Sequence, residues 1–282
     1  MILIADSGGS KLDWRILHDD GSIDQANGPG FNPYYQPASD LAQSIKENLS
    51  AKVNGNVEKI FFYGAGVSSP NNEQIVRSTL ADFFPNATIE IQWDLLAAAR
   101  SLCGHEEGIA CILGTGSNSC FYDGIKVVYN VPTVGWILGD EGGGAYIGKR
   151  LLIDYIQREM PEELWKQFNA RFPLQREEIL ERVYQKERPS TFLGSFTRFV
   201  FQHLKQPYCY QLVYSGFEDF CKKYVMKYDN FKNTKVHFTG SVAFYFSDVL
   251  RQVGNDLGIP IKNISESPIA GLTLYHQKDL NQ

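Results

Sequence analysis

Two glycine-containing loops have the composition of a phosphate-binding site. The first, at 6–11, reads Asp-Ser-Gly-Gly-Ser-Lys and follows an apolar run. The second, at 114–118, reads Gly-Thr-Gly-Ser-Asn and follows the apolar run at 109–113. Glycines let main-chain N–H groups approach phosphate oxygens closely, and an acid beside such a loop, here Asp6, can hold Mg²⁺. The alternative interpretation of each loop is an ordinary hairpin turn.

An aspartate stands between a strand-like run and a helix-like run. Asp94 follows the run at 88–93 and precedes Leu-Leu-Ala-Ala-Ala. An aspartate in that position is commonly the N-cap of the helix. The same position lies outside the carboxyl end of a strand, where an acid can act as a general base. The residues alone leave both roles open.

A third segment, 135–148, contains six glycines in fourteen residues together with Asp140 and Glu141. So many glycines are costly in chain entropy and indicate that the main chain approaches something closely. The segment also contains the start of a P-loop motif, but Arg150 stands where that motif needs Ser or Thr, so we do not expect a P-loop.

A fourth candidate is Thr-Gly-Ser at 239–241, after the late strand-like run at 235–238. Ser241 could cap the following helix. Alternatively, a nucleobase or ribose could lie against the main chain of Gly240. The residues leave these two interpretations open.

Strand-like runs alternate with helix-like runs, which indicates an α/β fold with parallel strand pairing. We expect strands at 1–6, 12–18, 23–27, 60–63, 88–93, 109–113, 235–238 and 260–265, a hairpin at 119–131, helices at 38–50, 72–84, 94–103 and 242–257, mostly helical structure at 145–228, and a last helix from 267.

The order strand, glycine loop, strand, Asp-Gly turn occurs twice, with turns at 20–21 and 123–124. This pattern suggests an internal duplication. We therefore expect an N-terminal domain at 1–104 and a C-terminal domain at 105–282, the latter with a helical insertion at about 145–228. The last helix, at about 268–280, is an element that can pack back on the N-terminal domain.

Composition restricts the class of protein. Of 282 residues, 43% are hydrophobic and 21% are charged, which is ordinary globular usage. The formal net charge of −5 disfavours general nucleic-acid binding. No signal peptide or membrane span is visible in the sequence, and its five cysteines include no Cys-x-x-Cys pair. We therefore expect a cytoplasmic protein with reduced thiols and without membrane attachment. The aromatic-rich stretch at 192–228 fits either a core or the contact face of a homodimer.

In their order along the chain, these four segments resemble the actin-like ATPase superfamily. More closely, they resemble its BadF/BadG/BcrA/BcrD-type branch and, within it, N-acetylglucosamine kinases. Trp136-x-x-Gly139-Asp140-Glu141-Gly142 is the most specific marker. The resemblance implies two ribonuclease-H-like domains around a central cleft that close on ATP-Mg²⁺ and a substrate.

The resemblance also implies roles for single residues. Asp6 would organise the metal, and Asp94 matches the catalytic acid of the family. Nucleotide binding would involve Ser7, Gly8, Gly9, Ser10, Lys11, Gly114, Thr115, Gly116, Gly240 and Ser241, the last two at the adenosine. Sugar binding would involve Asn32, Ser68, Thr115 and Asp140. Leu12, where relatives commonly carry Thr, and the looser helix start at 270–274 depart from the family pattern.

The function that follows from this resemblance is an ATP-dependent amino-sugar kinase. Its expected substrates are ATP and a small sugar, with phosphate transferred to the 6-hydroxyl of N-acetylglucosamine or a related sugar. Two alternatives are an ATPase that activates a radical dehydratase through an iron–sulfur cluster, and a non-enzymatic sugar sensor on a kinase fold.

Overall fold

The computed structural model describes residues 1–9 and 11–280, with side chains up to 277. The chain forms two compact units. The first contains residues 1–105, residues 124–126 and the segment from Ser267 onward, and the second contains residues 106–123 and 127–266. The segment from Ser267, which the division at residue 104 assigned by range to the C-terminal domain, thus groups with the first unit.

The sheet of the first unit has the order β3-β2-β1-β4-β5. Its strands are β1 (Ile2–Ser7), β2 (Lys11–Leu17), β3 (Ile23–Pro29), β4 (Lys59–Gly64) and β5 (Thr88–Trp93). The expected parallel pairing holds for β1, β4 and β5, whereas β1, β2 and β3 form an antiparallel meander. The difference arises because turns of only a few residues join the first three strands, and such turns can connect only antiparallel neighbours.

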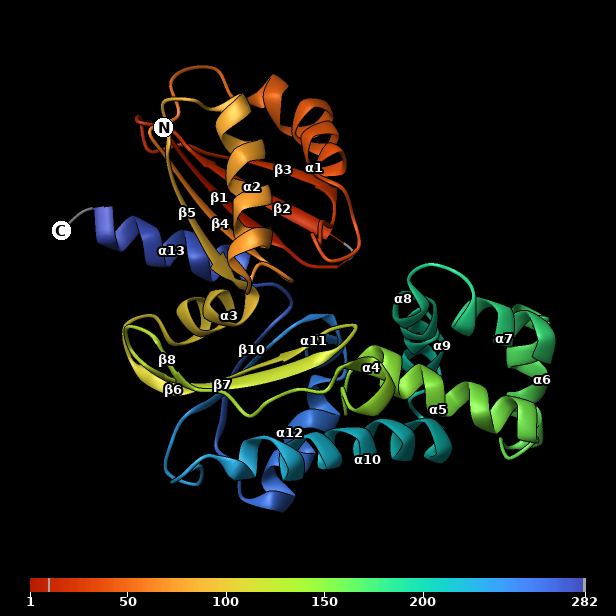
Figure 1. Ribbon diagram of the computed structural model, residues 1–282. Helices are drawn as coiled ribbons and strands as arrows, with labels where there is room; N and C mark the ends of the chain where they lie inside the picture. The colour runs from red at the N-terminus through yellow and green to blue at the C-terminus, as the bar shows by residue number, and fades with distance from the viewer. Residues whose placement is uncertain (10, 281–282) are drawn as a thin grey trace. The chain divides into compact units, whose positions relative to one another are not determined.

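Helices cover both faces of this sheet (Figure 1). They are α1 (Ala38–Ser44), which continues into a π-helical turn at Ile45–Leu49 and a 3₁₀ turn at Ser50–Lys52, α2 (Pro70–Phe83), α3 (Asp94–Cys103) and α13 (Ile269–Leu280). Because side chains alternate along a strand, Leu3 and Ala5 pack in the core with α1 and α2, while Ile4 packs in the core with α3 and α13.

The second unit repeats this topology. Its sheet has the order β10-β9-β6-β7-β8, with β6, β7 and β8 antiparallel and with β9 and β10 parallel to β6. The strands are β6 (Glu107–Leu113), β7 (Ser117–Asp123), β8 (Val127–Tyr129), β9 (Val236–Thr239) and β10 (Ile261–Ser265). The duplicated strand order confirms the expected α/β class with two ribonuclease-H-like sheets.

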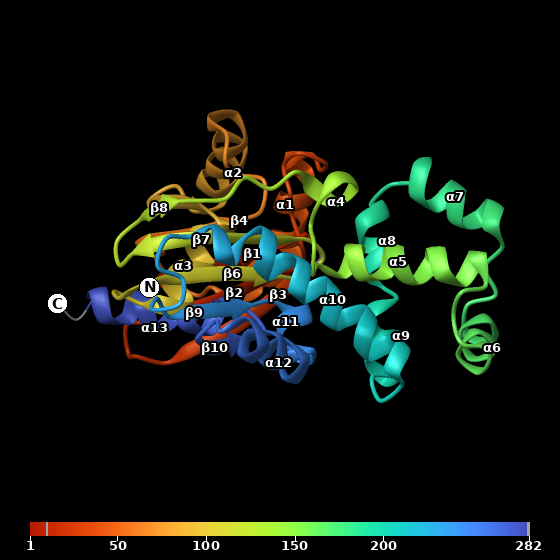
Figure 2. The same ribbon diagram turned by 90° about the horizontal axis from the view of Figure 1, so that it is seen from below.

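The stretch at 145–228 is mostly helical, as expected. The helices of the second unit are α4 (Gly135–Leu138), α5 (Gly144–Gln157), α6 (Glu162–Arg171), α7 (Arg176–Tyr184), α8 (Pro189–Gly194), α9 (Thr197–Gln202), α10 (Pro207–Lys223), the 3₁₀ turn Val225–Lys227, α11 (Ser241–Tyr245) and α12 (Ser247–Leu257). Within this unit, α6 and α7 lie at the end of α5 that is remote from the sheet (Figure 2).

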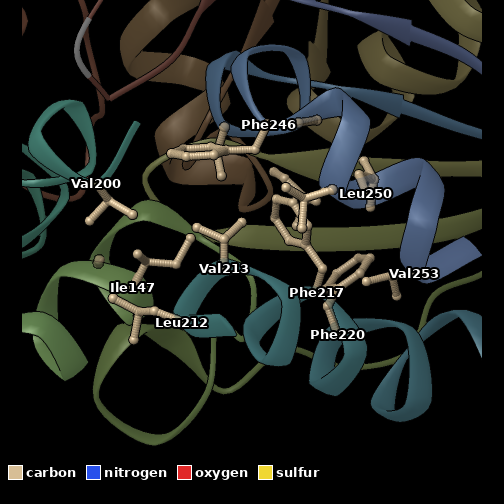
Figure 3. Packing of buried hydrophobic residues seen from close by; sticks show 14 of the residues in the cluster. Ile147, Val200, Leu212, Val213, Phe217, Phe220, Phe246, Leu250 and Val253 are labelled. Atoms are coloured by element: carbon tan, nitrogen blue, oxygen red, sulfur yellow. The ribbon is translucent and has the colours of Figure 1, made fainter. Parts of the chain in front are cut away.

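The aromatic residues of this helical stretch contribute mainly to a core. Phe217 and Phe220 of α10 pack with Ile147 of α5 and with Phe246 and Leu250 (Figure 3). Phe201 and Tyr210 are exceptions, with 42% and 36% of their surface exposed. Within the described part of the chain, no helix is both long and apolar enough to cross a membrane.

Candidate functional site

Strand register brings two of the predicted site residues to one edge of the first sheet. Ser7, Gly64 and Trp93 are register partners across the parallel strands β1, β4 and β5. Asp6 precedes Ser7 and Asp94 follows Trp93, so both carboxylates belong to the carboxyl edge of the sheet. In open α/β sheets that edge is where ligands bind.

Asp13 is a third carboxylate at this place, and the sequence analysis missed it. Asp6 and Asp13 are direct cross-strand partners in the β1–β2 hairpin, so their side chains project from the same face of the sheet. Asp13 is only 5% exposed, and the ammonium of Lys11 lies 2.7 Å from its Oδ1. A Lys-x-Asp sequence on the second strand of the predicted hairpin was the signal that could have indicated this residue.

Burial and neighbouring negative charges make the carboxyl group of Asp6 less acidic. Burial, together with the nearby carboxylates of Asp13 and Asp94, raises the pKa of Asp6 to about 7, against a hydrogen bond from Ser267 and the charge of Lys11. Asp6 is therefore poised to exchange its proton for a cation near neutral pH.

Asp94 lies one position inside its helix. Trp93 occupies the N-cap of α3 and Asp94 is the first helical residue, so the N-cap interpretation of Asp94 is wrong. Burial raises the pKa of Asp94 to about 6, although main-chain N–H groups of Leu95 and of Asp94 itself lower it in part. The carboxylate is thus partly desolvated and titrates close to neutrality, as a general base should.

The acidic group also suits a magnesium ion. The carboxylates of Asp13 and Asp94 raise the proton affinity of Asp6, and a cation bound at Asp6 would relieve that repulsion. The described residues contain no set of three or more His, Cys, Asp or Glu side chains arranged to bind a metal. Mg²⁺ in nucleotide sites commonly takes one or two carboxylates and completes its shell with water and phosphate oxygens, so Asp6 fits that arrangement.

The first glycine loop is a tight hairpin turn. The N–H of Gly8 donates to the carbonyl of Lys11 over 2.9 Å, and Gly9 is exposed with no neighbour within 4 Å of the place a Cβ would take. Ser10 lies outside the described residues. The main chain of Gly9 is therefore open to an anion, whereas Lys11 is paired with Asp13.

Ser7 has a different environment from the rest of this loop. It is fully buried, and its hydroxyl donates to the carbonyl of Phe31 over 3.0 Å and accepts the N–H of Phe31 over 3.1 Å. The carbonyl of Ser7 accepts the N–H of Ala65. Ser7 therefore links the glycine loop to the segment that carries Asn32, and its hydroxyl is already engaged within the protein.

Asn32, a predicted sugar contact, is held in a fixed orientation. Its side-chain Oδ1 accepts the N–H of Tyr34 over 3.0 Å, and its own N–H donates to Gln36 Oε1 over 3.0 Å. A Cβ at Gly66 would overlap Oδ1 of Asn32, and Gly66 has a φ of +79°. Ser68, the other predicted contact in this unit, is exposed two residues further on.

The second glycine loop closes the β6–β7 hairpin and contacts α5. The N–H of Gly114 donates to the carbonyl of Gly116 over 3.0 Å. The carbonyls of Gly114 and Thr115 accept the N–H groups of Gly144 and Ala145, each over 2.8 Å. These first two amides of α5 are thus engaged by the loop itself, which fixes the loop on the helix N-terminus.

The glycine-rich segment at 135–148 allows several main-chain contacts within the second unit. A Cβ at Gly116 would lie 2.6 Å from Oδ2 of Asp140, and a Cβ at Gly143 would lie 2.8 Å from the carbonyl carbon of Gly116. A Cβ at Gly148 would overlap the carbonyl of Leu193, at the packing of α5 on α8. This packing of α5 on α8 explains why residue 148, which matches the second glycine of a P-loop motif, is a glycine.

The adjacent acids Asp140 and Glu141 have different environments. Burial raises the pKa of Asp140, while the main chain of Ser117 hydrogen-bonds to its carboxylate and lowers it in part. Glu141 is only 4% exposed, pairs with Lys223 and accepts the hydroxyl of Tyr224 over 3.1 Å. Burial raises the pKa of Glu141, but these bonds lower it by more. Asp140 therefore stands against Gly116 of the loop, while Glu141 anchors this segment to α10.

Gly240 and Ser241 lie beside the same loop. Gly240 is the N-cap of α11, and a Cβ there would overlap the carbonyl of Leu113, so the chain needs glycine at this crossing. Ser241 is exposed and is the first residue of the helix, and no side-chain capping bond forms. The interpretation of Ser241 as the cap is therefore wrong.

The fold and sequence were compared with those of known proteins. No family model matches the sequence, and no curated protein matches it. Among solved structures, a putative N-acetylglucosamine kinase from Porphyromonas gingivalis is 38% identical, with 99% of each chain covered and a TM-score of 0.93.

Two more distant structures share the fold. One is a putative N-acetylglucosamine kinase from Chromobacterium violaceum, 16% identical, with 97% of this chain and 98% of the other covered and a TM-score of 0.68. The other is a putative N-acetylmannosamine kinase from Listeria monocytogenes, 13% identical, with 99% of each chain covered and a TM-score of 0.53. At 38% identity over nearly its whole length, the chain belongs to the family of the Porphyromonas gingivalis putative N-acetylglucosamine kinase.

Proposed function

We propose that this protein is an ATP-dependent kinase of the BadF/BadG/BcrA/BcrD-type branch that transfers phosphate to the 6-hydroxyl of N-acetylglucosamine or a closely related amino sugar. The observation that carries the proposal is the placement of Asp94, with its raised pKa, at the same sheet edge as Asp6. The full-length likeness to a putative N-acetylglucosamine kinase supports it.

Asp94 is the proposed general base. The sugar hydroxyl donates its proton to the Asp94 carboxylate, its oxygen forms a bond to the γ-phosphorus, and the bond from that phosphorus to ADP breaks. Phosphoryl transfer needs little covalent help from the protein and depends on positioning and charge neutralisation. A carboxylate at the first position of α3, fixed by main-chain N–H groups, satisfies the positioning requirement.

The first glycine loop and Asp6 are the proposed phosphate and metal contacts of the first unit. Asp6 would hold Mg²⁺, and the main chain of Gly9 would face a phosphate. The ammonium of Lys11 is paired with the carboxylate of Asp13. When bound, Mg²⁺ neutralises phosphate charge. The protein's own contribution is the carboxylate group that attracts the cation.

The second unit contributes a rigid loop to this proposal. Gly114, Thr115 and Gly116 would contact phosphate and sugar, with Asp140 as a further sugar contact held against Gly116. Gly240 and Ser241 would lie at the adenosine. The bonds from α5 to the loop carbonyls fix the loop, so its remaining polar groups are preorganised for a ligand.

One observation weighs against the dehydratase-activator alternative. A cluster shared between subunits needs cysteine thiolates at the surface, yet Cys111, Cys120, Cys209 and Cys221 are fully buried. Burial also raises the pKa values of Cys209 and Cys221 to about 12, which disfavours the thiolate form. Only Cys103 is partly exposed.

The test is ADP release from ATP-Mg²⁺ with a panel of N-acetylglucosamine, N-acetylmuramic acid, glucosamine, N-acetylmannosamine and glucose. We expect turnover on an amino sugar, and a loss of about 10²–10⁴-fold in Asp94→Asn with nucleotide binding retained. The matched control is Asp82→Asn, the same change at an exposed position of α2 in the same unit. Near wild-type turnover in Asp94→Asn contradicts the assigned base, and sugar binding without turnover favours the sensor alternative.

A further inference from the structure

Asp140 has a main-chain conformation that is unusual for a residue with a side chain. Its φ is +57°, in the left-handed region that glycine adopts readily and other residues seldom adopt. Such a conformation persists only where the surrounding structure fixes it. The contacts that fix it therefore also determine where the carboxylate of Asp140 lies.

The chain before Asp140 contributes little to this fixation. Ile137 and Leu138, in the four-residue helix α4, are 66% and 78% exposed. The ammonium of Lys149 reaches two carbonyls of this helix, but over the long distances of 3.3 and 3.4 Å. The residues at 141–145, by contrast, are all buried. The fixation of Asp140 thus comes mainly from the residues that follow it.

Glu141, the next residue, is held by the end of α10. Its side chain is only 5% exposed, and its carboxylate pairs with the ammonium of Lys223 and accepts the hydroxyl of Tyr224 over 3.1 Å. A buried carboxylate is costly unless it is paired, so residue 141 has one favourable place. An apolar side chain of similar size could pack in several positions, because apolar contacts are not directional.

The carboxylates of Asp140 and Glu141 bind two different elements. The main-chain N–H of Ser117 donates to the carboxylate of Asp140, whose Oδ2 would lie 2.6 Å from a Cβ at Gly116. The carboxylate of Glu141 binds the end of α10 instead. Two adjacent side chains that are fixed at different places leave little freedom to the peptide between them. A return of Asp140 to the right-handed conformation would have to break one of these contacts.

We propose that Glu141, held by Lys223 and Tyr224, is a positioning residue that keeps the carboxylate of Asp140 against the second glycine loop. This inference rests on the proposed function for its consequence, since Asp140 is there a sugar contact. A carboxylate that is already fixed loses little further entropy when a ligand binds to it. The side chain of Lys223 is 57% exposed, so its ammonium stays hydrated when Glu141 is replaced.

The experiment compares Glu141→Met, Lys223→Met and Lys223→Arg in the full-length protein, with Lys222→Met as the matched control. Lys222 belongs to the same last turn of α10 but pairs with Glu218. We expect both Met variants of the ion pair to lower kcat/KM for the sugar that wild type turns over fastest by about 10²-fold, with KM for ATP unchanged. Lys223→Arg keeps the cation and should restore most of the activity, and Lys222→Met should resemble wild type.

A second readout, hydrogen exchange at the amide of Ser117, needs no substrate. We expect faster exchange there in Glu141→Met and Lys223→Met, while the amide of Phe217 in α10 keeps its protection. Unchanged exchange at Ser117 overturns the positioning role, and so does an equal loss of protection at Phe217, which would indicate general destabilisation. An unchanged kcat/KM for the sugar in both variants also overturns it.

A wild-type protein that phosphorylates no sugar overturns the proposed function instead. Exchange at Ser117 then still decides whether Glu141 positions Asp140, so the two failures are distinguishable.

Discussion

Asp6 and Asp13 face each other across the antiparallel β1–β2 pair, on the face of the sheet that α3 and α13 cover. Like charges directly opposite each other in a sheet are destabilising. Lys11 forms an ion pair with one of the two carboxylates, because its ammonium lies 2.7 Å from Asp13. The pKa of Asp6 is raised chiefly by burial and then by the charges of Asp13 and Asp94, and the charge of Lys11 lowers it only in part. Asp6 is thus the carboxyl group of this pair that is ready to exchange a proton for a metal near neutral pH.

Removal of the charge on Asp13 should make Asp6 more acidic. In Asp13→Asn the repulsion disappears and Lys11 loses its partner, and both changes favour the ionised form of Asp6. We expect the pKa of Asp6 to fall from about 7 by on the order of one unit. Carboxyl ¹³C NMR titration of the metal-free protein measures this, with Asp82→Asn as the matched control. An Asp6 titration that does not move would show that burial alone sets its pKa.

The proposed base predicts the acid limb of the pH profile. Because burial raises the pKa of Asp94 to about 6, the carboxylate that accepts the proton is lost as pH falls through that value. We expect kcat/KM for the sugar to fall about ten-fold per pH unit below about pH 6 and to level off above it. Initial rates between pH 5 and 8, with the coupling enzymes in excess at each pH, test this. A rate that is flat down to pH 5 would remove Asp94 from the role of base.

Much of the fold was predictable because it depends on local patterns. The apolar runs, the glycine loops and the Asp-Gly turns recur in both halves, and the two sheets repeat one strand order. The position of Asp94 was predictable for the same reason, since it directly follows a strand-like run and precedes a helix-like run. The orientation of Ser7 away from Asp6 also follows from the alternation of side chains along a strand.

Other parts of the site depend on contacts between distant segments. Ser267 reaches Asp6 only because the chain returns to the first unit after β10. Glu141 is bound by Lys223 and Tyr224, more than 80 residues further along the chain. No local pattern encodes either contact. The sequence therefore indicated which loops carry the chemistry but not which residues hold those loops in place.

Gly66 should be essential for the geometry of Asn32. Gly66→Ala would place a Cβ against Oδ1 of Asn32 and would force a φ of +79° on an alanine. We expect the sugar KM to rise about ten-fold or more with a smaller change in the KM for ATP, and a stability cost of about 1–2 kcal/mol. Gly21→Ala is the matched control, because Gly21 has a φ of +83° but open space around its Cβ position. Equal sugar affinity in the two variants would show that a Cβ at residue 66 does not disturb Asn32.

His276 should make the docking of α13 sensitive to pH. Its Nε2 lies 2.8 Å from the hydroxyl of Tyr63 on β4, its ring stacks on Phe61 at 3.6 Å, and only 2% of it is exposed. Arg100 of α3 donates to the same hydroxyl over 2.6 Å, so one tyrosine joins a strand and two helices.

Burial lowers the pKa of His276 to about 3, helped by the positive charges of Arg100 and Lys59. The unfolded chain therefore binds a proton between pH 3 and 6.5 that the folded protein excludes. The stability contributed by the neutral ring is complete above pH 6.5 and is lost as pH falls toward 3. In His276→Gln this dependence disappears, so the stability advantage of wild type should shrink by on the order of 2 kcal/mol between pH 7 and pH 4.5. Urea unfolding at the two pH values measures it, and an advantage that stays constant would mean that the buried ring accepts a proton without loss of packing.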